Sequence, residues 1–162
     1  MKNVIVKNSM NKTYATNLIS ELPETGEYEI IIKKVGLDST SRQRRLQWMW
    51  YTEVSRSGLG RNDDKRGVHL DAKWQFARPI LLRDDDVFVD IYNGFMEIID
   101  RYDPEIKKEC IRAFCEDYIS TEKMTKEQRA EYLTEFQRCW TGHGVELTDP
   151  AMQGVDLNIY DT

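Results

Sequence analysis

The stretch from Ser41 to Ser57, SRQRRLQWMWYTEVSRS, decides the fold, because it predicts a helix with two unlike faces. At about 100° per residue, the apolar side chains fall together on one face, namely Leu46, Met49, Trp50 and Val54. The opposite face carries Arg44, Arg45, Trp48, Tyr51, Thr52 and Ser55. We expect the apolar face to pack into a hydrophobic core.

The opposite face joins two guanidinium groups to two aromatic rings. Single-stranded nucleic acid is bound by such a combination, since cations follow the phosphates while bases stack on the rings. Arginine suits this role because its guanidinium binds phosphate through two N–H groups. The same pattern is typical of rings that pack against another helix or a second subunit. The sequence leaves both interpretations of Trp48 and Tyr51 open.

The next segment, Ser57 to Gly67, is polar and glycine-containing, and we expect it to be a loop. Positive charge continues through it in Arg61, Lys65 and Arg66, with Arg56 just before it. Loops are where binding groups often lie, and this one would close over a flexible strand. A loop that is merely solvated is the alternative interpretation.

Charge is distributed unevenly along the 162 residues. The formal net charge of -5 argues against a uniformly basic coat for nucleic acid. From Lys33 to Arg83, however, 12 Lys and Arg stand against 5 Asp and Glu. A basic block between acidic flanks favours a polyanionic partner, although such unevenness also arises without one.

Hydrophobic patterns before and after this helix predict both strands and helices. Val4 to Val6 and Tyr28 to Val35 are typical of strands, and Ser9 to Leu22 has the spacing of an amphipathic helix. A helix from Leu70 to Arg83 should bend or break at Pro79, which lacks a backbone N–H. The sequence therefore predicts an α+β fold, in which a small β-sheet element precedes a mainly helical domain.

Capping residues mark three further helices. Asp84 to Asp86 can cap a helix whose apolar stripe we expect in the core, made of Phe88, Ile91, Tyr92, Phe95, Ile99 and Tyr102. Asp103 and Pro104 should open a helix that runs to Tyr118. Thr125 and Gln128 form a capping-box pattern for a helix that ends near His143.

Cysteine content and hydropathy indicate the cellular compartment in which we expect the protein. The apolar runs are far shorter than the roughly 20 residues that a membrane-spanning helix needs. The first ten residues lack the pattern of a secretory signal, so we expect a cytosolic protein that has no membrane partner. Cys110, Cys115 and Cys139 then suit reduced thiols better than disulfides.

Two groups of residues in the sequence are candidate metal ligands. Cys139 and His143 have helical i, i+4 spacing, but Cys110 and Cys115 would lie about 140° apart on one helix and cannot easily grip the same zinc ion. An aspartate cluster could hold magnesium in a nuclease, and its members are Asp84, Asp85, Asp86 and Asp90. Helix capping explains most of that cluster, and His69 suits a packing role. We therefore expect no metal, no cofactor and no catalytic residue, with a metal-dependent nuclease as the alternative.

The residues Ser39 to Trp48, STSRQRRLQW, resemble a signature of the NinB/Orf recombination mediators. In that family a strand leads into the pattern Arg-Ser-x-x-Gln-Asn-Arg-x-x-Trp, which Gln43, Arg45 and Trp48 match. Ser39 and Arg44 depart from it. The resemblance continues at Leu70-Asp71-Ala72, at Met124-Thr125 and at Gly144 to Pro150, over roughly Glu27 to Ala151.

This resemblance implies a single NinB/Orf-like domain over residues 1–151, followed by an acidic tail over 152–162. It implies an intertwined homodimer that binds single-stranded DNA or DNA junctions and helps to load a recombinase or annealing protein in phage recombination. Such a protein would work in the cytoplasm of an infected bacterium, beside a host or phage single-strand-binding protein and a recombinase. The candidate DNA-binding residues are Arg42, Gln43, Arg44, Arg45, Trp48, Arg56, Arg61, Lys65 and Arg66.

Overall fold

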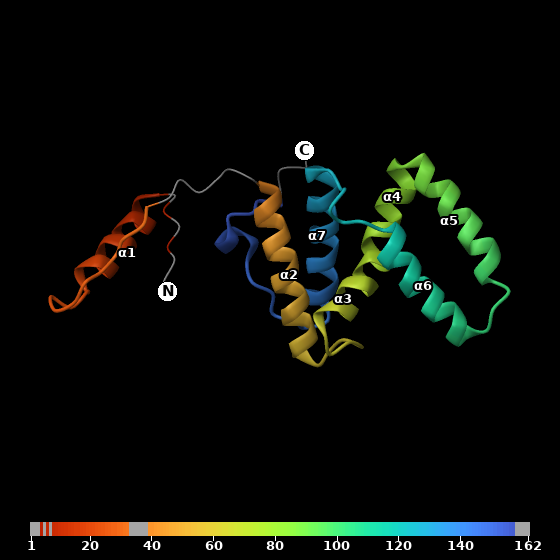
Figure 1. The fold of residues 1–162 in the computed structure, drawn as a ribbon, viewed down its shortest axis with the longest axis horizontal. Helices are drawn as coiled ribbons and strands as arrows, with labels where there is room; N and C mark the ends of the chain where they lie inside the picture. Colours follow the sequence, from red (N-terminus) through yellow and green to blue (C-terminus); the bar gives the residue numbers. More distant parts are fainter. Residues whose placement is uncertain (1–3, 5, 7, 33–38, 158–162) are drawn as a thin grey trace. The chain divides into compact units, whose positions relative to one another are not determined.

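The computed structural model describes residues 4, 6, 8–32 and 39–157, and helices with their connecting turns make up this part of the chain (Figure 1). The chain divides into two compact units, residues 1–37 and residues 38–162. The first contains helix α1 (Ser9–Ser20), which matches the predicted helix at this place. Asn8 caps α1 by accepting a hydrogen bond from the Asn11 backbone N–H at 2.9 Å, and none of the helix residues is buried.

The predicted α+β fold is wrong, because no strand occurs in the described part of the chain. Val4, Val6 and residues 28–32 have no regular secondary structure, while Ile5 and residues 33–35 lie outside the described residues. The side chains of Ile30, Ile31 and Ile32 are exposed. Branched apolar residues favour a strand only where a neighbouring strand takes up the backbone hydrogen bonds and a core covers one face. The described chain is therefore all-α.

The second unit is built around α2 (Ser39–Ser57), which lies beside α7 (Lys126–Gly142) and α3 (Lys65–Ala72) (Figure 1). The predicted apolar face of α2 does enter the core, since Leu46, Trp50 and Val54 are fully buried. The Trp50 ring stacks on Phe136 of α7 with 5.9 Å between centroids. Its indole N–H donates to the Thr148 carbonyl at 2.8 Å, so this buried polar group is satisfied.

Helix α3 begins within the predicted loop. Asp64 accepts a hydrogen bond from the Gly67 N–H at 2.8 Å, and this cap starts the helix at Lys65 instead of Leu70. A π-helical segment, η1 (Lys73–Ala77), then leads into α4 (Arg78–Asp84), where Pro79 stands in the first turn. The wider turn lies where the proline would otherwise break the hydrogen-bond ladder, so the helix continues through the expected break.

The remaining helices follow their predicted caps. Asp85 caps α5 (Asp86–Ile99), Asp103 caps α6 (Pro104–Tyr118), and Thr125 with Gln128 forms the capping box of α7. A short helix, η2 (Pro150–Gln153), lies near the end of the described chain. The expected core stripe on α5 is only partly right. Phe88 and Ile99 are buried and Tyr92 and Phe95 half-buried, but Ile91 and Tyr102 are exposed.

Thr125→Ala tests the α7 cap. The substitution removes the acceptor of the Gln128 N–H, now at 3.1 Å, and should lower the free energy of unfolding by about 1 kcal/mol. Urea denaturation followed by circular dichroism measures this change. Thr125→Ser keeps the hydroxyl and should restore most of the stability, whereas equal losses in both variants would contradict a capping role.

Candidate functional site

The exposed face predicted for α2 is largely covered. Tyr51 is 0% exposed, and its hydroxyl lies 2.5 Å from that of Tyr132 on α7. Gln43 is also buried, with its amide donating to the Lys126 carbonyl at 3.5 Å. Arg44 forms an ion pair with Glu122 at 2.6 Å. For Tyr51 the packing interpretation is therefore the right one, because α7 covers the side of α2 that the helical wheel left open.

Trp48 is 39% exposed and packs by one side of its ring. The imidazole of His69 on α3 lies 4.9 Å from it, between centroids, and Tyr51 meets it edge-on at 5.2 Å. Burial, with smaller contributions from the nearby charges of Lys73 and Arg66, lowers the pKa of His69 to about 4. His69 is thus a neutral packing residue near neutral pH.

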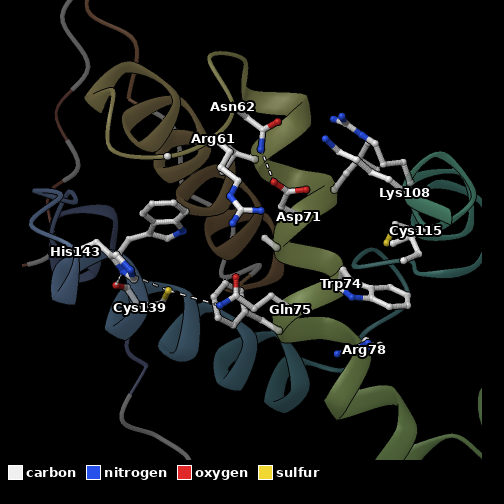
Figure 2. A pocket seen from close by; sticks show the side chains of 18 of the residues that line it. Arg61, Asn62, Asp71, Trp74, Gln75, Arg78, Lys108, Cys115, Cys139 and His143 are labelled. Atoms are coloured by element: carbon white, nitrogen blue, oxygen red, sulfur yellow. Dashed lines mark hydrogen bonds between the residues drawn. The ribbon is translucent and has the colours of Figure 1, made fainter. Parts of the chain in front are cut away.

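A groove of about 860 Å³ opens on another side of α3 (Figure 2). Its walls come from the loop Leu59 to Asn62, from the run α3 and η1, and from α6 and α7. Figure 2 shows Arg61 and Asp71 pointing into the same space from the loop and from α3, with Lys108 on the α6 side. The cationic lining residues are Arg61, Arg78, Lys107, Lys108 and Arg112, and Asp71 is the one acidic residue among the described lining residues.

Three of these cations have no partner among the described residues. Lys107 pairs with Asp100 at 2.7 Å, and Arg78 lies 4.1 Å above the Trp74 ring. Arg61, Lys108 and Arg112 form no hydrogen bond or ion pair within the described part of the chain. Like charges that share a concave, low-dielectric surface repel one another and focus a positive potential there. The groove is therefore electrostatically suited to an anion.

The deeper lining is apolar, with Val68, Leu70, Ala72 and Phe76 buried and the Trp140 ring half-buried. Gly60 allows this arrangement, because a Cβ at that position would lie 3.1 Å from the Trp140 ring. A larger residue at this position would require the Trp140 ring to shift. The groove thus combines an apolar, partly aromatic lining with cationic side chains.

Lys73 fixes the two walls of the groove to each other. Its side chain is buried, and its ammonium donates to the Cys115 carbonyl at 3.1 Å. Cys115 lies in the last turn of α6, where backbone carbonyls have no helical partner and the helix dipole is negative. Burial lowers the pKa of Lys73. The hydrogen bond to the Cys115 carbonyl holds the buried ammonium in place, and this bond joins η1 to the end of α6.

The two candidate metal sites do not assemble as ligand sets. Cys139 Sγ lies 3.8 Å from His143 Nδ1, but that nitrogen is 2.6 Å from the Cys139 carbonyl, which occupies it. Asp84 accepts hydrogen bonds from Arg83 and Gln128, and Asp85 caps α5. Across the described residues, no three His, Cys, Asp or Glu side chains are grouped as metal ligands would be.

The candidate residues named from the sequence are scattered over the second unit. Arg61 alone among them lines the groove. Arg45, Arg56 and Lys65 are exposed elsewhere, Arg42 is half-buried, and Arg66 pairs with Glu116. Lys108 and Arg112 were not among the predicted residues, although their i, i+4 spacing places them on one face of a helix. The neighbouring sequence does not predict which other helix that face packs against.

Comparison of the chain with protein-family models, curated proteins and solved structures gives no significant match. None of the helices in the described residues is both long and apolar enough to cross a membrane. The function must therefore be argued from the groove itself and from the sequence resemblance.

The pKa of His69 predicts a pH dependence of stability. Below its ordinary value of 6.5 the unfolded chain binds a proton, whereas the folded chain does not until about pH 4. Stability should fall as the pH drops through this window, with a slope of at most about 1.4 kcal/mol per pH unit for the single proton. Urea unfolding at pH 7 and pH 4.5 should show the advantage of the wild type over His69→Gln shrinking at low pH. If the difference in unfolding free energy between the wild type and His69→Gln does not change with pH, His69 is not held neutral in the folded chain.

Proposed function

We propose that this chain binds single-stranded DNA in the groove between α3, α6 and α7. The observation that supports the proposal is a concave site in which an apolar, partly aromatic lining meets three cations that have no partner among the described residues. Lys108 and Arg112 lie one helical turn apart on α6, so they can follow successive phosphates. The apolar interior suits bases, which stack on rings and shed water there.

A single strand fits these features better than a duplex. In a duplex the bases are paired and stacked inward, so a protein surface meets mainly phosphate and groove edges. The apolar part of the site, which includes the Trp140 ring, would then remain empty. An unpaired strand can turn bases into the groove while its phosphates stay near the cations at the edge. A groove of about 860 Å³ has the size of sites that enclose small ligands, which suits individual bases.

The resemblance to the NinB/Orf mediators extends the proposal to a biological role. On that basis the chain is a non-catalytic accessory protein that helps to load a recombinase or annealing protein onto DNA during phage recombination. A nuclease is the competing function, and incubation of labelled single strands with Mg²⁺ or Mn²⁺ separates the two. Intact strands that remain bound support a mediator, whereas metal-dependent cleavage contradicts it.

The homodimer implied by the resemblance stays a prediction. Tyr51, one of the two rings for which the sequence left a subunit interface open, is wholly buried within its own chain. Sedimentation at tens of micromolar, on the order of a standard working concentration, would decide the oligomeric state.

Arg112→Ala tests the groove. If Arg112 contacts a phosphate, its loss should weaken binding to every strand and reduce the slope of log affinity against log salt by about 0.7. Fluorescence anisotropy with a labelled oligo-dT strand, measured over a series of salt concentrations, gives both quantities. Lys108→Ala should behave in the same way.

The matched control is Arg101→Ala, which removes an exposed cation after α5 that is not part of the groove lining. Its salt slope should equal that of the wild type. If both groove variants keep the wild-type salt slope, the DNA binds outside the groove, and the exposed Arg45 and Arg56 are the next candidates for phosphate contacts. A wild-type protein that fails to bind any single strand would overturn the proposed function.

A further inference from the structure

We propose that the groove selects guanine among the bases of a single strand, with Asp71 and Arg61 reading its edge; this inference rests on the proposed function. Asp71 is the feature that phosphate binding does not explain. It is the one carboxylate among the described lining residues of a cationic groove. A carboxylate near the phosphate path repels phosphate, so its presence there suits a ligand group that donates hydrogen bonds.

The Asp71 side chain is held in a defined orientation. The Asn62 amide donates a hydrogen bond to Asp71 Oδ2 (Figure 2). Asn62 in turn lies directly on Gly67, where a Cβ would come within 2.5 Å of the Asn62 carboxamide oxygen. Only a glycine at this point of α3 leaves room for Asn62, which then orients Asp71. The bond to Oδ2 leaves Oδ1 without a hydrogen bond from any described residue, and Oδ2 keeps a second lone pair, so the carboxylate can still accept from a ligand.

Arg61 supplies the complementary group. Its guanidinium enters the same space as Asp71 (Figure 2), yet forms no hydrogen bond or ion pair with any described residue. A free guanidinium beside an oriented carboxylate presents donors and acceptors next to each other. The ligand that matches this pair must carry neighbouring acceptors for the guanidinium and neighbouring donors for the carboxylate.

Guanine carries both sets of groups, on two adjoining edges. Its O6 and N7 accept two hydrogen bonds from an arginine. Its N1–H and N2–H groups are neighbouring donors on the Watson–Crick edge, which an unpaired base exposes and a carboxylate can accept together. Cytosine and adenine each offer a single amino group flanked by an acceptor. Thymine offers one N–H between two carbonyl oxygens, which would face the Asp71 carboxylate unfavourably. Lys108 and Arg112 remain available for the phosphates on the α6 side.

The test compares oligo-dT strands that carry one central dG, deoxyinosine, dA, dC or dT, with binding measured by anisotropy. The wild type should bind the dG strand about fivefold or more tightly than the all-dT strand, as a bidentate base contact requires. Deoxyinosine lacks only the 2-amino group and should lose much of this advantage. Equal affinity for all five strands would overturn guanine selection while leaving single-strand binding intact. A wild type that binds none of the strands would instead overturn the proposed function on which the inference rests.

Asp71→Asn separates base reading from a merely structural role. The variant should lose the preference for dG and bind the all-dT strand more tightly than the wild type, because one repulsive charge is gone. If Asp71 only supports the loop through Asn62, the variant should bind every strand more weakly and keep the dG preference, and that result would overturn the inference.

Asp90→Asn is the matched control, since it removes an exposed carboxylate from α5 outside the groove lining. It should retain the dG preference of the wild type. Loss of the preference in this control as well would assign the effect to net charge and would also overturn the inference.

Discussion

The burial of α2 is the constraint on which the rest of the second unit depends. Trp50 stacks on Phe136, and the neighbouring Tyr51 places its hydroxyl against Tyr132, so two consecutive residues enter the core together. Consecutive helical side chains point about 100° apart, and burying both requires cover on more than one side. Helix α7 covers one side, and His69 of α3 covers the other by packing on Tyr51. This position of α3 makes it a wall of the groove.

The distribution of charge in the sequence has a different meaning once the chain is folded. Three arginines of the basic block form ion pairs with glutamates of the acidic C-terminal flank: Arg44 with Glu122, Arg66 with Glu116, and Arg83 with Glu131. These exposed pairs contribute little to stability individually, but they neutralise three of the arginines of the basic block. Lys73 is buried against the end of α6. The groove combines Arg61 and Arg78 of the basic block with Lys107, Lys108 and Arg112 of the acidic C-terminal flank, so its cations come from both kinds of segment.

In the proposed function, the two sides of the groove make different contacts, one with phosphates and the other with a base. The α6 side offers unpartnered cations on a regular helical spacing, which phosphates can meet without regard to sequence. The α3 side offers an oriented carboxylate and a free guanidinium, which can distinguish one base edge from another. Two glycines make this possible by close approach, Gly60 beneath Trp140 and Gly67 beneath Asn62. A side chain at position 60 would crowd the Trp140 ring, and one at position 67 would displace the Asn62 side chain.

The sequence by itself determined the features that depend on a few neighbouring residues. It predicted the caps at Asp85, Asp103 and Thr125 and the buried face of α2, because a cap needs only the side chain and the N–H groups two or three residues away. It predicted strands at Val4 to Val6 and Tyr28 to Val35, of which the described residues form none, and it left open whether Tyr51 is buried, because both features depend on partners distant in the sequence. The groove was decided by the tertiary structure alone. Arg61, Asp71, Arg112 and Trp140 come from four different segments, and only the packing of α3, α6 and α7 around a common core brings their side chains to one surface.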